Sequence, residues 1–237
     1  INGGPGVTDR RKYKRMYGKM LDFRRRLGMG RRMDRTSLVR ERARLFGSPF
    51  LEALTVIPAP AFIALWAILL PAILVCALVF APTFWAPALL VAGALVWSFT
   101  EYALHRYVFH FEARSERVKR WIYIIHGNHH ADPNDPLRNL MPPVVSLPVA
   151  ALVWLACVGA IGAAGTWVFL GFMLGYVAYD LVHYACHQWP MKSRFARVLK
   201  VHHMRHHHLR VRGNYAITGM AWDRLLATRI DSPRDRV

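Results

Sequence analysis

Hydrophobic and charged positions are segregated along this chain. No Asp, Glu, Lys or Arg occurs between Glu52 and Glu101, or between Arg138 and Asp180. Each gap is about twice the roughly 20 residues that cross a bilayer as a helix, and no polar stripe recurs at helical period in either. Helix-breaking residues lie near the middle of each gap, at 81–83 and 159–165. The pattern predicts two apolar helical hairpins, with helices over residues 59–80, 85–104, 144–162 and 166–184.

The distribution of positive charge predicts an orientation for these hairpins. An even number of crossings leaves residues 1–52, 105–140 and 185–237 on one side of a membrane, and these segments hold all 32 Lys and Arg. Under the positive-inside rule, that side is the cytoplasm. We therefore expect an all-α integral membrane protein with four transmembrane helices and a cytoplasmic helical cap. A bias of 26 Arg to six Lys favours the inner membrane of a GC-rich bacterium. A soluble protein with two apolar core hairpins is the alternative.

The first 52 residues are expected to form a basic arm, separate from a membrane domain over residues 53–237. The first fifty hold 15 Lys or Arg and four acids, within a chain of net charge +18. Apolar residues recur at spacings compatible with an amphipathic surface helix: Tyr13, Met16, Tyr17, Met20, Leu21 and Leu27. Since a membrane span follows, anionic lipid headgroups are a nearer partner than nucleic acid. The arm is not expected to be a cleaved signal peptide, because the apolar region after it is too long.

The three cysteines lie in or beside the predicted spans, and no disulfide is expected on the reducing side of the membrane.

The histidines indicate more about the function than the cysteines do. All twelve lie on the predicted cytoplasmic side or at the inner ends of spans, in four groups: HRYVFH at 105–110, HGNHH at 126–130, HYACH at 183–187 and HHMRHHH at 202–208. The last group is interrupted and internal, unlike a purification tag.

The spacing of these histidines is typical of metal ligands. His126, His129 and His130 are related as i, i+3 and i+4, as are His203, His206 and His207, so each set is expected on one helical face. His183 and His187 form an i, i+4 pair that can share a metal. His105 and His110, five apart, do not share a face of an α-helix, which suggests separate metals or a helix that ends between them.

Ten imidazoles at such spacing exceed the four to six ligands of one ion, so two metals are the natural count. Nearby Lys and Arg are expected to keep the rings neutral, which is the metal-binding form. Imidazole suits zinc, iron, copper and nickel alike, so residue type leaves the metal open.

Four histidine motifs in this order, with the hairpins between them, resemble the membrane fatty acid hydroxylase and sterol desaturase superfamily of oxygen-dependent di-iron enzymes. The resemblance covers about Trp97 to Thr228. The flanking runs EYALHRYVFH, HGNHHADPNDPLRNLMPP, GYVAYDLVHYACH and NYAITGMAWDRLLAT are similar to the fatty acid 2-hydroxylase branch. The resemblance implies ten ligands: His105, His110, His126, His129, His130, His183, His187, His203, His206 and His207. His202 and His208 are not among these ten. Because they flank the last motif, His202 or His208 could also be a member of it, and its register is uncertain by one residue.

The resemblance also implies a function and partners. We expect two iron ions, with zinc possible in a purified sample, together with dioxygen and electrons from a separate redox protein, since the arm has no histidine to hold a haem. The expected reaction hydroxylates an acyl chain of a fatty acid or lipid amide near its carboxyl end, on a substrate taken from the membrane. A sterol desaturase, a carotenoid hydroxylase and an alkylglycerol monooxygenase are the enzymatic alternatives. A metal transporter or sensor, or a non-enzymatic metal-binding membrane subunit, is the alternative from another class, and a larger membrane complex is a possible partner.

Two carboxylates are expected to support the ligands. Glu101 precedes His105 by one turn and Asp180 precedes His183 by three residues, so each is predicted to accept the free ring N–H of that histidine. An acid facing water or pairing with a nearby arginine is the alternative. A weaker expectation is that further residues brace the site or the substrate mouth: Asp132, Asp135, Arg138, Asn214, Tyr215 and Asp223.

Overall fold

The computed structural model describes residues 44–209 and 211–230. The amphipathic helix predicted between residues 13 and 27 lies outside the described residues. Within the described part, the structure is all-helical, as predicted.

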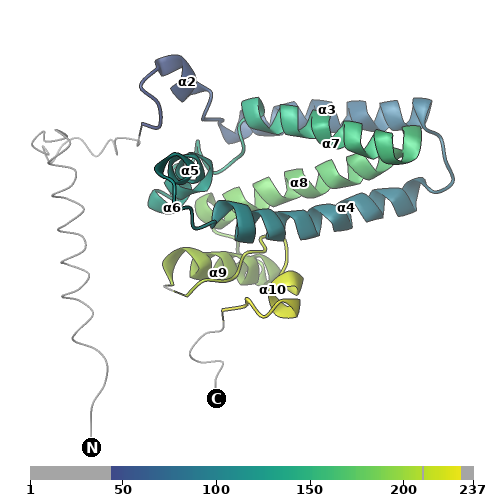
Figure 1. Cartoon of the computed structure of the whole chain (residues 1–237). Helices are drawn as coiled ribbons and strands as arrows, with labels where there is room; N and C mark the ends of the chain where they lie inside the picture. Colours follow the sequence, from purple (N-terminus) through teal and green to yellow (C-terminus); the bar gives the residue numbers. More distant parts are fainter. Residues whose placement is uncertain (1–43, 210, 231–237) are drawn as a thin grey trace, which may run out of the picture. The chain divides into compact units, whose positions relative to one another are not determined.

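Four long helices form the body of the described part (Figure 1). They are α3 (Ala59–Phe80), α4 (Ala86–Ala103), α7 (Pro143–Ile161) and α8 (Gly165–Gln188), and they confirm the four predicted helical segments to within a few residues. Short turns join α3 to α4 and α7 to α8 at one end of the bundle, and Gly162 adopts a φ of 66° in the second turn, where a side chain would be strained. α8 lies between α7 and α4 and carries more buried residues than any other described helix.

Three continuous helical stretches of the described residues are long and apolar enough to cross a membrane. They are Ala59–Phe80, Ala86–Phe109 and Pro143–Gln188, and the third contains both α7 and α8 with the 3-10 turn η3 (Gly162–Ala164) between them. Large apolar side chains cover the outside of these helices; Ile68 is 70% exposed and Phe80 is 74% exposed. Such a surface is typical of a protein that faces lipid.

The interior of the bundle is aromatic. Trp97 of α4 packs edge-to-face on Phe172, Tyr176 and Tyr179 of α8, with ring centroids 5.0–5.5 Å apart. Trp66 of α3 packs on the same Tyr176 at 5.4 Å. Edge-to-face pairs at this distance are the favoured aromatic geometry, so this cluster fixes α3, α4 and α8 relative to one another.

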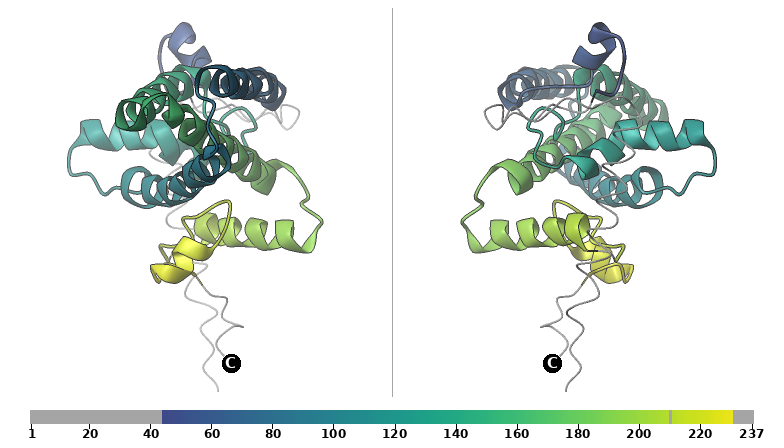
Figure 2. Two further views of the ribbon diagram at one scale, coloured as in Figure 1. Left: turned by 90° about the vertical axis from the view of Figure 1, so that its right-hand side faces the viewer. Right: turned by 90° about the vertical axis from the view of Figure 1, so that its left-hand side faces the viewer.

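The histidines gather at the end of the bundle away from the two turns. There, α4 continues as a π-helix, η1 (Leu104–Phe109), and the chain then forms α5 (Glu116–Ile122), a second π-helix η2 (Tyr123–Gly127) and α6 (Asn128–Ala131). After α8, the chain reverses into α9 (Arg194–His208) and ends its described part beyond α10 (Ala221–Leu225). Figure 2 shows α5 projecting to one side, with α9 and α10 beneath the bundle.

The short helix α2 (Pro49–Ala53) precedes the bundle and is attached to it by a carboxylate. Glu52 accepts hydrogen bonds from the backbone N–H groups of Leu45 and Phe46, both at 2.9 Å, and forms an ion pair with Arg138. The last residues of the predicted basic arm therefore contact the loop between α6 and α7.

Candidate metal centre

Ten histidines form two groups of five at this end of the bundle. Within each group, one ring nitrogen of every member lies within 4.8 Å of those of the other four. The first group comprises His105, His110, His126, His130 and His206, and the second comprises His129, His183, His187, His203 and His207. The structure thus brings together all ten histidines that the resemblance implies as ligands. Their role as ligands remains a proposal.

The two HxxHH motifs divide their histidines between the groups in the same way. His126 and His130 enter the first group, whereas His129 enters the second. In α9, the outer pair His203 and His207 enters the second group, and His206 enters the first. At about 100° per residue, positions i and i+4 lie close together and position i+3 lies on their other side, so the three rings span an arc of about 100°. Each motif can therefore face two centres rather than one.

The π-helix η1 explains how His105 and His110 share a group. The sequence suggested separate metals or a helix end between them, because residues five apart diverge on an α-helix. Residues 104–109 instead form a π-helix, in which each turn closes at i+5, and the helix then ends at His110. Wide turns of this kind stack residues five apart, so the two rings lie 5.1 Å apart at their centroids. The structure thus places both rings in one group rather than in separate groups.

The spacing of the ring nitrogens fits coordination of an ion. In the first group, the Nε2 atom of His206 lies 3.0 Å from that of His110 and 3.1 Å from that of His130. In the second group, the Nε2 atom of His203 lies 2.9 Å from that of His187 and 3.0 Å from that of His207. Donors about 3 Å apart and at right angles about a common centre lie roughly 2.1 Å from it, which is an ordinary metal–imidazole distance. Five imidazoles in this arrangement fit one metal ion per group.

Backbone carbonyls orient several of these rings from behind. The Nδ1 atom of His105 lies 2.6 Å from the carbonyl oxygen of Tyr215, and that of His206 lies 2.8 Å from the carbonyl oxygen of Gly213. A carbonyl can only accept, so each Nδ1 carries the proton and each Nε2 keeps a free lone pair toward its group. The same arrangement holds His183, whose Nδ1 lies 3.1 Å from the carbonyl oxygen of Asn139.

Asn139 contacts two histidines of the second group. Besides its carbonyl contact with His183, its side-chain Oδ1 lies 3.1 Å from the Nδ1 of His129. Its amide nitrogen donates to the carbonyl of Pro133 at 3.2 Å, which identifies Oδ1 as the acceptor toward the ring. The sequence did not predict the roles of Asn139 and Gly213, because neither residue lies at a ligand spacing. Every residue has a backbone carbonyl, so a contact made through one cannot be recognised from residue type.

The predicted contacts of Glu101 and Asp180 are wrong. Glu101 does not reach His105: its Oε1 accepts from the backbone N–H groups of Ile217 and Thr218, at 3.1 and 3.0 Å, and from the Thr218 hydroxyl at 2.8 Å. Asp180 accepts from the backbone N–H of Met141 at 3.1 Å. Carbonyls already occupy the Nδ1 positions of both histidines, so these buried carboxylates instead anchor the loops that supply the carbonyls.

His202 and His208 lie outside both groups. The Nε2 of His202 contacts the Oδ2 of Asp223 at 3.0 Å in a buried position, and His208 is exposed at the end of α9. The geometry therefore favours His203, His206 and His207 as the functional members of the last motif. Among the residues expected to brace the site, Tyr215 does so through its carbonyl and Asp223 lies directly behind it.

Burial keeps the clustered imidazoles neutral. Desolvation, followed by the neighbouring imidazoles His206 and His110, lowers the pKa of His130 to about 3. Desolvation likewise lowers the pKa of His206 to about 4, and desolvation with His206 and Arg212 lowers that of His110 to about 4. The sequence attributed neutrality to nearby Lys and Arg, but burial is the larger cause. Neutral, converging imidazoles are the form that binds a cation.

An all-helical bundle of apolar helices with two five-histidine groups at one end defines a class of histidine-rich helical proteins whose rings could hold metal ions, and comparisons assign the chain to a family. Residues 90–228 match the family model for fatty acid hydroxylase. The chain is 35% identical over 148 residues to the dihydroceramide fatty acyl 2-hydroxylase FAH2 of Arabidopsis thaliana, covering 62% of each protein. It is 36% identical over 142 residues to the fatty acid 2-hydroxylase of Homo sapiens, covering 58% of this chain and 38% of the relative.

A solved structure agrees with these relatives. The hydroxylase domain of full-length Scs7p superimposes with a TM-score of 0.72 at 29% identity, covering 78% of this chain and 71% of that one. The chain belongs to the fatty acid hydroxylase family. It spans less than two thirds of the length of the two curated relatives described above.

Proposed function

We propose that this chain is an oxygen-dependent di-iron hydroxylase that inserts a hydroxyl group at carbon 2 of the acyl chain of a fatty acid or lipid amide. The observation that supports it best is the pair of five-imidazole groups, each with Nε2 atoms about 3 Å apart, in a member of the fatty acid hydroxylase family. Iron bound in the two groups would supply the oxidising power for an unactivated C–H bond, which no side chain can provide.

The chain's own residues do the remaining work. The carbonyls of Tyr215, Gly213 and Asn139 hold protons on Nδ1 atoms and so keep Nε2 lone pairs directed inward. The helices that carry His105, His183 and His187 continue into the apolar bundle, so an acyl chain lying along the lipid-facing surface would bring its carboxyl end to the level of the two groups. Burial of the groups excludes water from the reacting centre.

We further propose that α3, α4, α7 and α8 cross the inner membrane of a bacterium as four spans, with the histidine end on the cytoplasmic side. The support is the absence of any charged residue at either hairpin turn and the exposed apolar surface of the helices. A separate redox protein would deliver the electrons, and anionic lipid headgroups would bind the basic segment before Glu52.

Comparison of one double substitution with one single substitution tests the proposed activity. Cells expressing the chain should incorporate one oxygen atom from ¹⁸O₂ at carbon 2 of their acyl lipids, measured by lipid mass spectrometry. H129A/H130A removes one histidine from each group and should abolish this incorporation, whereas H208A, on the same side of the bundle but outside both groups, should leave it unchanged. Metal binding without any oxygenated lipid, or an oxygenated sterol or carotenoid instead, would refute the proposal.

A further inference from the structure

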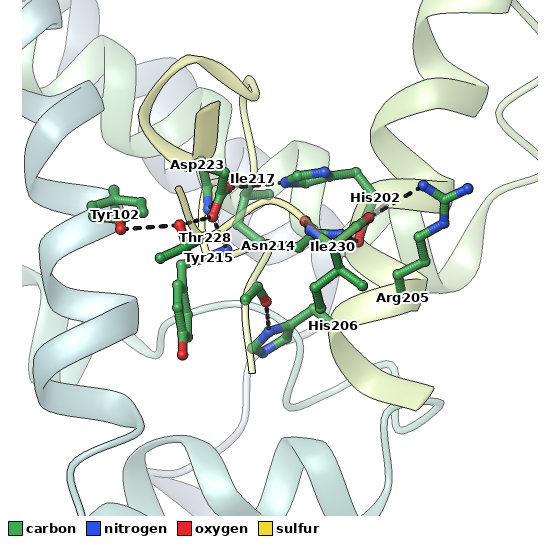
Figure 3. Close-up of polar contacts among 12 residues, drawn as sticks. Tyr102, His202, Arg205, His206, Asn214, Tyr215, Ile217, Asp223, Thr228 and Ile230 are labelled. Carbon is green, nitrogen blue, oxygen red and sulfur yellow. Dashed lines mark hydrogen bonds and ion pairs between the residues drawn. The ribbon is translucent and has the colours of Figure 1, made fainter. Parts of the chain in front are cut away.

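The segment between α9 and α10 is held by two buried carboxylates. Glu101 of α4 binds the backbone N–H groups of Ile217 and Thr218. Asp223 of α10 is fully buried; its Oδ1 accepts from the N–H of Tyr215 and from the Thr228 hydroxyl, at 2.9 and 2.7 Å. Its Oδ2 accepts from the N–H of Ala216 at 2.9 Å and contacts the Nε2 of His202 at 3.0 Å. Figure 3 shows Asp223 in this network.

One peptide group of this segment links Asp223 to a histidine of the first group. The N–H of Ala216 and the C=O of Tyr215 belong to the same peptide bond. The N–H end donates to the Asp223 carboxylate at 2.9 Å, and the C=O end accepts from the Nδ1–H of His105 at 2.6 Å. The carboxylate and the imidazole are therefore in contact with opposite ends of a single conjugated dipole.

A carboxylate on the N–H end of a peptide polarises its carbonyl. Hydrogen bonds in such a chain strengthen one another, more so away from water, and both Asp223 and His105 are buried. A more negative carbonyl oxygen binds the Nδ1 proton more tightly, which raises the electron density available at Nε2. We propose that Asp223 is a positioning residue for the first metal, acting on His105 through the Tyr215–Ala216 peptide group. This inference rests on the proposed metal-binding function.

A second peptide group of this segment also bridges a hydrogen-bond acceptor and a ligand-candidate histidine, but its acceptor is a neutral carbonyl instead of a carboxylate. Gly213 and Asn214 share a peptide bond whose N–H donates to the Thr228 carbonyl at 2.9 Å and whose C=O faces the Nδ1 of His206 at 2.8 Å. A Cβ on Gly213 would lie 2.1 Å from that Thr228 carbonyl oxygen, so only glycine permits this approach. His206 also belongs to the first group, and Figure 3 shows its ring beneath the segment.

Despite its burial, Asp223 is suited to remain ionised. Burial would raise the pKa of this carboxyl, but the hydrogen bonds from His202, Thr228, Ala216 and Tyr215 outweigh that effect and lower it. Within residues 44–209 and 211–230, no carboxylate reaches a second-group histidine through a peptide group in this way, and Asn139 contacts His129 and His183 directly. A loss of the Asp223 charge should therefore affect the first metal selectively.

The experiment compares metal release from the purified full chain carrying iron(II). Wild type should hold two ions. D223N keeps the shape of the side chain and removes its charge, and should release the first-group ion 10- to 100-fold faster to a chelator while the second is released at the wild-type rate. Mössbauer spectra of ⁵⁷Fe-loaded D223N should show two signals, of which one differs from wild type. H110A lacks a first-group histidine, so the signal that changes in H110A is assigned to the first-group ion.

Two threonine variants separate positioning from support of the fold. T228V weakens the Asp223 carboxylate's contacts and should speed release of the first ion by less than D223N does. T218V removes the hydrogen bond that the Thr218 hydroxyl donates to Glu101. Glu101 also accepts from the backbone N–H groups of Ile217 and Thr218, but the carbonyls of those two peptide groups contact no histidine of either group. T218V should therefore leave both release rates unchanged.

Equal effects of T228V and T218V, equal loss of both ions from D223N, or wild-type release from D223N would each overturn the positioning role. These outcomes are distinct from failure of the proposed function, in which wild type itself would hold no iron. Since T228V keeps the carboxylate, it tests the inference even where D223N fails to fold.

Discussion

Asn139 supports two rings of the second histidine group at once. Its backbone carbonyl holds His183 and its side chain holds His129, so one substitution can separate the two contacts. N139A keeps the backbone contact and removes the other. We expect it to weaken binding of the second-group ion by about tenfold and to leave the first unchanged.

Titration of apo protein with iron(II) under anaerobic conditions measures both affinities. N139D retains an oxygen acceptor for His129 and should bind the second ion more tightly than N139A does. An N139A protein with wild-type affinity at both positions would show that the Oδ1 contact does not orient the ring.

At this scale, the sequence predicted the clustered histidines but not their supports. The i, i+3 and i+4 spacing is local, and so it identified eight members of the two groups, whereas His105 and His110 were implied by the resemblance. The contacts behind the rings join positions far apart, such as His105 with Tyr215 and His183 with Asn139. Proximity along the chain wrongly favoured Glu101 and Asp180 as direct partners, because an acid one turn away is the only support that spacing can reveal.

Among the elements, the crossing of α4 and α8 sets the distance between the two groups, since α4 leads into His105 and α8 carries His183 and His187. Gly171 permits this crossing: a Cβ there would lie 1.9 Å from the carbonyl oxygen of Leu90. G171A should therefore force the helices apart and destabilise the protein by about 1–3 kcal/mol.

Thermal unfolding in detergent, followed by tryptophan fluorescence, tests this packing. G159A is a matched control, because a Cβ at Gly159 of α7 meets nothing within 4 Å and alanine favours a helix by up to about 1 kcal/mol. An unchanged unfolding temperature in G171A would mean that the α4–α8 crossing adapts to the methyl group.

Hydropathy predicted the long helices well, because apolar runs bounded by charges and helix breakers define them directly. It could not predict the π-helices η1 and η2. A π-turn interrupts the regular α-helical hydrogen bonds and forms where tertiary contacts compensate for that loss. Here the compensating contacts are those among His105, His110 and His126, which η1 and η2 bring together. The error at His105 and His110 followed from assuming α-helical geometry there.

For the molecule as a whole, the buried histidines make the metal-free protein sensitive to acid. Desolvation lowers the pKa of His206 to about 4. Desolvation, together with the nearby His206 and Arg212, lowers the pKa of His110 to about 4. In the unfolded chain, an imidazole has a pKa near 6.5. Between these values the unfolded chain binds more protons, so stability falls as pH falls. The unfolding temperature of apo protein should be level above about pH 7 and should decrease from about pH 6.5 toward pH 5.

Calorimetry or fluorescence across this pH range provides the measurement. H208A, which removes an exposed imidazole, should show the same slope as wild type. A flat profile between pH 6.5 and 5 would contradict the burial of the groups in the metal-free state.

The composition of α9 has a consequence for how this helix is attached. Its buried residues are Leu199, His202, His203 and His206, whereas Phe195, Val198 and Val201 are exposed. One buried aliphatic side chain offers little hydrophobic driving force for association, so the contacts of the imidazole rings contribute much of what attaches this helix. If both histidine groups bind ions as proposed, each ion would link α9 to the bundle, and removal of the metal should detach α9 at a lower temperature than the bundle unfolds.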